Sequence, residues 1–153
     1  MARGRRNVDV SEACRSGVSD AEQTRAALKA RSDTIEEAYE FFLAYASQGL
    51  PTDENTSHPI REHLKRFDQA LNGLGDFFLE CAKQLGVSDL VPYKKFCDVV
   101  DRDGREAQAA LQLVLAQPAI GSQTIDNLNA SIHIRALLTD LFLIDEILKS
   151  LRS

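Results

Sequence analysis

A few polar side chains lie where the helical pattern of this sequence calls for apolar ones. They are Arg31, Asp103, Asn129, His133 and Asp140. A buried charge that loses its partner costs about 3–5 kcal/mol, so such residues either pair with one another or bind a ligand. The simplest interpretation is that Arg31 pairs with one or both aspartates and fixes the alignment of the helices.

Helical geometry gives several of these residues a similar depth in the fold. Depth is counted from the end where the first two predicted helices join, at about 1.5 Å per residue. Arg31 then lies about 25 Å down, Asp140 about 24 Å and Asp103 about 20 Å. Gly75 shares the level of Arg31 and would leave room beside it. The sequence therefore predicts a buried polar layer of Arg31, Asp103, Asp140, His133 and Gly75.

Two other interpretations of these residues stay open. If the first helix begins near Thr34, which has capping-box spacing with a glutamate three positions later, then Arg31 lies in solvent. Alternatively, His133 and Asp140 bind a small ligand or a divalent metal ion, with Asp103 contributing. Imidazole and carboxylate groups suit such ions. His133 and Asp140 are therefore the candidate metal ligands.

Known catalytic and cofactor motifs do not fit the chain. Neither His63 nor His133 has a glutamate three residues before it, as di-iron carboxylate bundles require. The segment "DRDG" at 101–104 resembles part of a calcium-binding loop, but Ala110 stands where the last carboxylate ligand belongs. No glycine-rich phosphate loop or nucleophile motif is present in the sequence. We therefore expect no catalytic residue and no cofactor.

The spacing of apolar residues and of helix-ending residues predicts an all-α fold. Gly49 and Pro51 end the first helix, Pro59 opens the second, and Gly86 ends it. Because the connections are short, consecutive helices should lie antiparallel, in an up-down-up-down four-helix bundle. The bundle is expected over residues 19–153, after a flexible, disordered tail at 1–18. Its helices are expected at about 21–48, 59–85, 89–116 and 123–151.

The segment "LNGLG" at 71–75 lies in the middle of the second predicted helix. Asn-Gly is a common turn signal, yet the apolar residues keep alternating steps of four and three from Ile60 to Leu85. This pattern favours one continuous helix, in which each interior glycine costs about 1 kcal/mol relative to alanine. Gly75 falls beside the apolar stripe and Gly73 on the solvent side.

Composition and charge narrow the classes of partner. The formal net charge of the 153 residues is −5, which argues against a nucleic-acid partner because phosphate binding needs a basic face. No run approaches the roughly 18 apolar residues of a membrane span. The three cysteines lack CxxC spacing, which fits a reducing compartment. We therefore expect a cytoplasmic protein with no nucleic-acid or membrane partner.

The fourth predicted helix is the most apolar of the set. Residues 134–148 leave only a narrow polar stripe, so the helix is either central in the bundle or in contact with another chain. The second interpretation is favoured, with Leu138, Phe142 and Leu143 as the interface. The predicted function is a non-enzymatic interaction or regulatory protein, as a homodimer or with another protein. The alternative is a ligand- or metal-binding sensor bundle that uses His133, Asp140 and Asp103.

Overall fold

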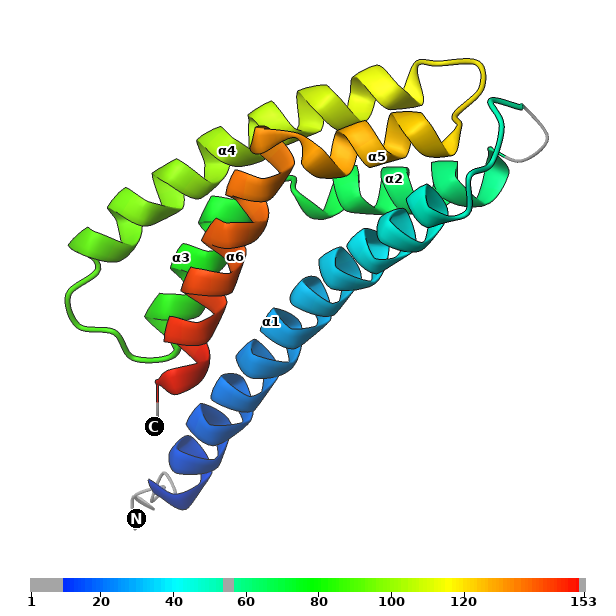
Figure 1. The fold of residues 1–153 in the computed structure, drawn as a ribbon. Helices are drawn as coiled ribbons and strands as arrows, with labels where there is room; N and C mark the ends of the chain where they lie inside the picture. Colours follow the sequence, from blue (N-terminus) through cyan, green and yellow to red (C-terminus); the bar gives the residue numbers. More distant parts are fainter. Residues whose placement is uncertain (1–9, 54–56, 152–153) are drawn as a thin grey trace, which may run out of the picture.

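The structure is a computed structural model and describes residues 10–53 and 57–151. These residues form six helices and no strand, so the fold is all-α, as predicted (Figure 1). In chain order the helices are α1 (Val10–Ser47), α2 (His58–Ala70), α3 (Leu74–Gln84), α4 (Val91–Leu115), α5 (Ser122–Ala130) and α6 (Ile132–Ser150).

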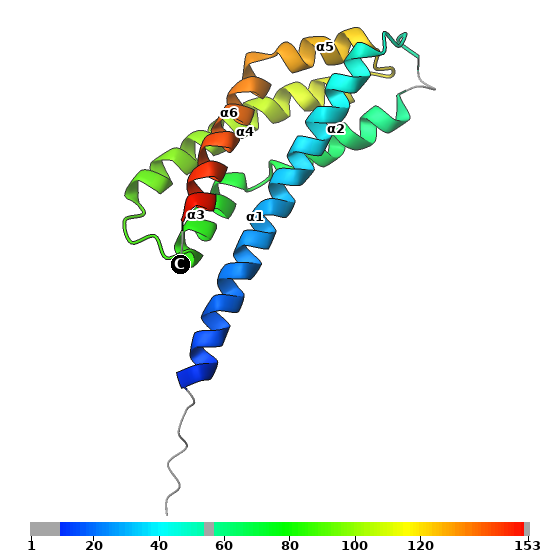
Figure 2. The same cartoon turned by 60° about the horizontal axis from the view of Figure 1, so that its bottom comes forward.

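Two long helices pack against four shorter ones. α1 and α4 lie on opposite sides of the molecule, with α2, α3, α5 and α6 between them (Figure 1). α1 packs mainly on α2 and α5, while α4 packs mainly on α3 and α6. The core between them is apolar, and its largest fully buried side chains include Phe42, Phe67 and Phe78. The start of α1 extends beyond the other helices in both views (Figures 1 and 2).

The first helix is longer than predicted. α1 begins at Val10 and not near residue 21, so residues 10–18 are helical and the predicted disordered tail is wrong over that segment. The physical reason is that no proline and only one glycine interrupt the sequence of α1. Residues 1–9 of the predicted tail lie outside the described residues. At the other end Gly49 adopts the left-handed conformation with a φ of 63°, as its place after the helix predicts.

The second predicted helix is not continuous. Gly73 adopts a left-handed φ of 62°, and the chain turns there between α2 and α3. The amides of Leu71 and Asn72 bond back to Asp68 and Gln69, each over three residues, which tightens and ends α2. The Asn-Gly turn signal therefore prevails over the apolar repeat, because both halves still bury their apolar residues after the turn.

The fourth predicted helix is also divided in two. Ser131 has an extended ψ of 130°, and it joins α5 to α6 without a loop. Its amide donates to the carbonyl of Leu128, and its own carbonyl accepts the first bond of α6, from the amide of Arg135. Within the described residues the side chain of Ser131 makes no capping hydrogen bond to α6, so the main chain alone joins the two helices. The prediction of four uninterrupted helices is therefore wrong at residues 71–73 and at residue 131.

A buried set of hydrogen bonds joins the connections at one end of the helices. The hydroxyl of Ser122 donates to the carbonyl of Tyr45 at 2.6 Å and accepts from the amide of Leu50 at 2.8 Å. The phenol of Tyr45 donates to the carbonyl of Ile120 at 2.5 Å, and the amide of Ile120 donates to the hydroxyl of Ser57 at 2.9 Å. These bonds fix where α5 begins relative to α1.

None of the described helices combines the length and the apolar character needed to cross a membrane.

Candidate functional site

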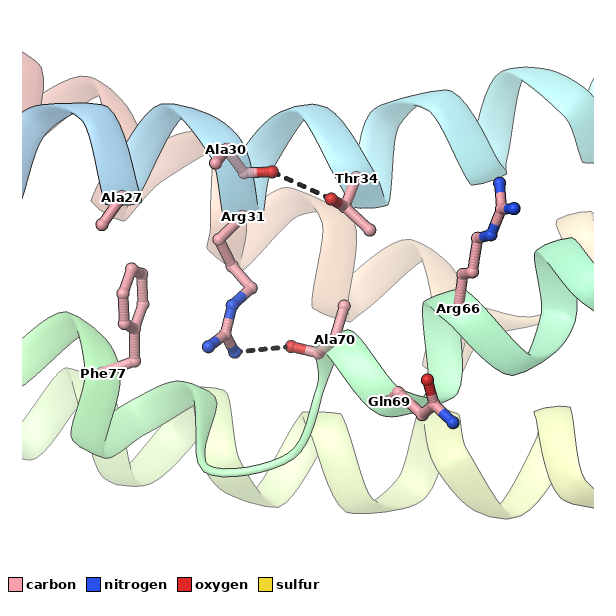
Figure 3. Close-up of a pocket in the computed structure, with 8 residues that line it drawn as sticks. All are labelled: Ala27, Ala30, Arg31, Thr34, Arg66, Gln69, Ala70 and Phe77. Carbon is pink, nitrogen blue, oxygen red and sulfur yellow. Dashed lines mark hydrogen bonds between the residues drawn. The ribbon is translucent and has the colours of Figure 1, made fainter.

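Arg31 does not pair with an aspartate. One nitrogen of its guanidinium, Nη1, donates a hydrogen bond of 3.0 Å to the main-chain carbonyl of Ala70, the last residue of α2 (Figure 3). Its Cζ atom lies 4.5 Å from the centre of the Phe77 ring, a cation–π contact. Arg31 therefore stabilises the carbonyl end of α2, which the turn before α3 leaves without a helical partner.

Gly75 leaves room for α4 and not for Arg31. Its amide donates to a carboxylate oxygen of Asp101 at 2.8 Å, so Asp101 caps the start of α3 from a neighbouring helix. A Cβ atom at Gly75 would lie 2.5 Å from the carbonyl oxygen of Cys97 and 2.4 Å from the Asp101 carboxylate. Sequence reasoning missed Asp101, and its place in "DRDG" gave no signal for this role.

His133 lies on the surface and not in a buried layer. Its Nδ1 atom is 3.1 Å from a carboxylate oxygen of Glu106 on α4, and the two side chains are 51% and 53% exposed. With Arg31, Gly75 and His133 placed elsewhere, the predicted five-residue layer is wrong. The physical reason is that the breaks in the second and fourth predicted helices change which side chains meet.

Asp103 and Asp140 do face each other, across the contact between α4 and α6. Burial, and then the Asp103 carboxylate, raise the pKa of Asp140 from 3.8 to about 7. One buried oxygen of Asp140 has no hydrogen-bond donor beside it within the described residues. Two carboxyl groups can share a hydrogen bond only when one is protonated, so the pair can bind one proton near neutral pH.

The predicted metal ligands do not form a site. No group of three His, Cys, Asp or Glu residues suited to a metal ion occurs in the described part of the chain. His133 and Asp140 are seven residues apart on one helix, which separates them by about 10 Å along its axis. A single ion therefore cannot bind both side chains.

An apolar groove runs between the start of α4 and the end of α6. Its volume is about 250 Å³. The exposed face of α6 next to it carries Phe142, Leu143 and Ile147. The lining residues are Pro92, Tyr93, Phe96, Leu143, Ile144 and Ile147.

Two of the three predicted interface residues lie on this exposed surface. Phe142 is 56% and Leu143 52% exposed, whereas Leu138 is only 5% exposed. The assignment of Leu138 to an interface is therefore wrong, because its side chain faces the core. Ile147 was missed as a surface residue, since periodicity alone did not separate it from the buried positions of α6.

A second groove lies between α1 and the junction of α2 with α3 (Figure 3). Its volume is about 520 Å³, and Arg31 and Arg66 both line it. This groove was not predicted from the sequence, because the turn at Gly73 that shapes it was predicted to be helix.

Comparison of the chain with protein-family models, with curated proteins and with solved structures finds no match.

Proposed function

We propose that this chain is a non-enzymatic interaction protein that forms a homodimer through α6. The observation that carries the proposal is the exposure of four large apolar side chains on this one helix. Ile132 is 73%, Phe142 56%, Leu143 52% and Ile147 38% exposed, and Leu143 and Ile147 line the apolar groove. Apolar side chains gathered on one face in this way are typical of protein interaction sites.

The solvent-facing side of α6 has the spacing of a helix–helix seam. Six exposed residues follow one another in steps of three and four along the helix, which keeps them on one face. The seam spans about 26 Å at 1.5 Å per residue. Its residues are Ile132, Arg135, Thr139, Phe142, Glu146 and Lys149.

A second copy of the chain fits this seam in an antiparallel arrangement. In a two-fold dimer every contact occurs twice with the roles exchanged. When Phe142 packs against Thr139 of the second copy, Arg135 lies opposite Glu146 of the second copy. Neither Arg135 nor Glu146 forms an ion pair within the described residues. Opposite charges therefore meet on both sides of the two central Phe142–Thr139 contacts, which supports this orientation.

The proposal extends to the topology of the helices and to the cellular location of the protein. We propose that the fold is an antiparallel four-helix bundle in which two of the four helices are interrupted. The two continuous helices are α1 and α4, and the two interrupted ones are α2 with α3 and α5 with α6. We also propose a cytoplasmic, regulatory role. The free thiols of Cys81 and Cys97 support the location, since reducing compartments keep thiols unpaired.

Charge reversal at the seam provides the test, with sedimentation equilibrium as the measurement. Arg135→Glu and Glu146→Arg should each weaken the dimer about tenfold or more, because each change sets like charges against each other twice. The double variant should recover the wild-type dissociation constant. Arg102→Glu, on the exposed face of α4, is the matched control and should change nothing. A wild-type protein that stays monomeric at high concentration refutes the homodimer, and a dimer unaffected by either single reversal refutes the α6 seam.

A further inference from the structure

We propose that the groove between α1 and the α2–α3 junction binds a small organic anion with two or more negative charges. The groove is open to solvent and has a volume of about 520 Å³, which leaves room for a small molecule against its walls. Two arginines line it and no acidic residue does. Alanine side chains from α1 and α2 form much of the remaining wall and leave the space open.

Arg31 is held in position for such a ligand. Its bond to the Ala70 carbonyl and its contact with the Phe77 ring fix the guanidinium at the groove (Figure 3). One of its five N–H groups makes the Ala70 bond, and the planar fork of a guanidinium matches carboxylate and phosphate oxygens. A fixed donor binds an anion with little loss of conformational freedom.

Arg66 supplies a second positive charge from the other wall. It extends from α2 toward α1, one helical turn before Ala70, which is about 6 Å along the helix axis (Figure 3). The side chain of Arg66 is exposed and forms no ion pair within the described residues. It is therefore free to turn toward a ligand bound at Arg31, and a ligand with two acidic groups can bind both arginines.

The charge around the groove favours a small anion over a polyanion. The chain has a formal net charge of −5, and Glu36 and Glu37 are exposed on α1. A nucleic acid laid along α1 would meet these carboxylates, whereas a small molecule stays within the groove. Gln69 and Thr34 add polar groups between the two arginines.

Isothermal titration calorimetry at low ionic strength tests this site, with citrate and pyrophosphate as probes and acetate as the singly charged reference. The wild-type protein should bind at least one probe with a dissociation constant below about 1 mM. Which probe binds tighter shows whether the site prefers carboxylates or phosphates.

The variants separate this groove from general surface charge. Arg66→Gln should weaken binding about tenfold by removing one charge-assisted contact. Ala30→Leu should weaken it similarly, because the larger side chain fills the groove without changing the charge. The controls are Arg102→Gln on α4 and Ala26→Leu on α1, both exposed and outside the groove, and they should bind as wild type does. The proposal is overturned if neither probe binds, if acetate binds equally well, or if Arg102→Gln weakens binding as much as Arg66→Gln.

Discussion

Replacement of Asp140 by asparagine should stabilise the protein at neutral and alkaline pH. In the wild type, Asp140 faces Asp103, and burial together with that neighbouring carboxylate raises the pKa of Asp140 from 3.8 to about 7. Above pH 7 both carboxylates are charged and repel each other across α4 and α6. An asparagine at 140 carries no charge, and its amide can donate a hydrogen bond to Asp103, so the unfavourable contact becomes a favourable one.

The size of the effect follows from the pKa shift. Between 3.8 and about 7, each step of one in the pKa of Asp140 corresponds to about 1.4 kcal/mol of stability. The upper bound is thus about 4 kcal/mol, and because Asp140 is only partly buried, solvent screening reduces it to roughly 1–2 kcal/mol. The folded protein binds this proton more tightly than the unfolded chain does. The stability that proton binding at Asp140 adds to the wild type is therefore lost as the pH rises from about 4 to about 7.

Urea denaturation of the wild type and the Asp140→Asn variant, over a series of pH values, measures this difference. The variant should unfold at higher urea than the wild type at about pH 8, and the difference should shrink as the pH approaches about 5. Asp103→Asn should behave in the same way, since it removes the same repulsion. Asp126→Asn, on the exposed face of α5, is the matched control. An Asp140→Asn variant that is less stable than the wild type at pH 8, or equally stable at every pH, refutes the reasoning.

Three further substitutions test the contacts between helices, each by urea denaturation. Gly75→Ala should destabilise by about 1–3 kcal/mol, because its Cβ would lie 2.5 Å from a main-chain oxygen of α4. The matched change Gly104→Ala, with its nearest neighbour atom 4.0 Å away, should be neutral or stabilise by up to about 1 kcal/mol; equal effects of the two would contradict the close approach at Gly75. Arg31→Met should cost about 1–2 kcal/mol, since it leaves a carbonyl of α2 without its donor, and a loss of 4 kcal/mol or more would instead indicate a buried ion pair. Ser122→Ala should cost about 1–3 kcal/mol by leaving the partly buried amide of Leu50 without an acceptor, and an unchanged midpoint would show that water replaces the hydroxyl.

Local sequence determined the helices and several of their ends. The apolar periodicity predicts helices over about 21–48, 59–85, 89–116 and 123–151, and the structure confirms an all-α fold. Gly49 and Gly86 end helices with φ values of 63° and 85°, as glycines placed after the last apolar position should. The predicted third helix, at 89–116, agrees closely with α4 at Val91–Leu115. These features depend on neighbouring residues only, so they can be predicted from one sequence.

The tertiary structure decided where the helices break. At residues 71–73 the apolar repeat and the Asn-Gly signal point in opposite directions, and the repeat alone favoured a helix. The break leaves main-chain groups without helical partners, and residues from other helices satisfy them. Arg31 on α1 donates a hydrogen bond to the carbonyl of Ala70, and Asp101 on α4 accepts one from the amide of Gly75. Such partners lie 39 and 26 residues away along the chain, so local patterns contain no information about them.

The same distinction applies to the polar residues on the apolar faces of the helices. The sequence determined that Arg31, Asp103 and Asp140 interrupt apolar faces, and therefore that each needs a partner. Which partner each one meets depends on how the helices cross, because a side chain reaches only a few ångströms from its own helix. The crossing of α4 and α6 brings the two aspartates together, while the turn at Gly73 draws Arg31 to a backbone carbonyl.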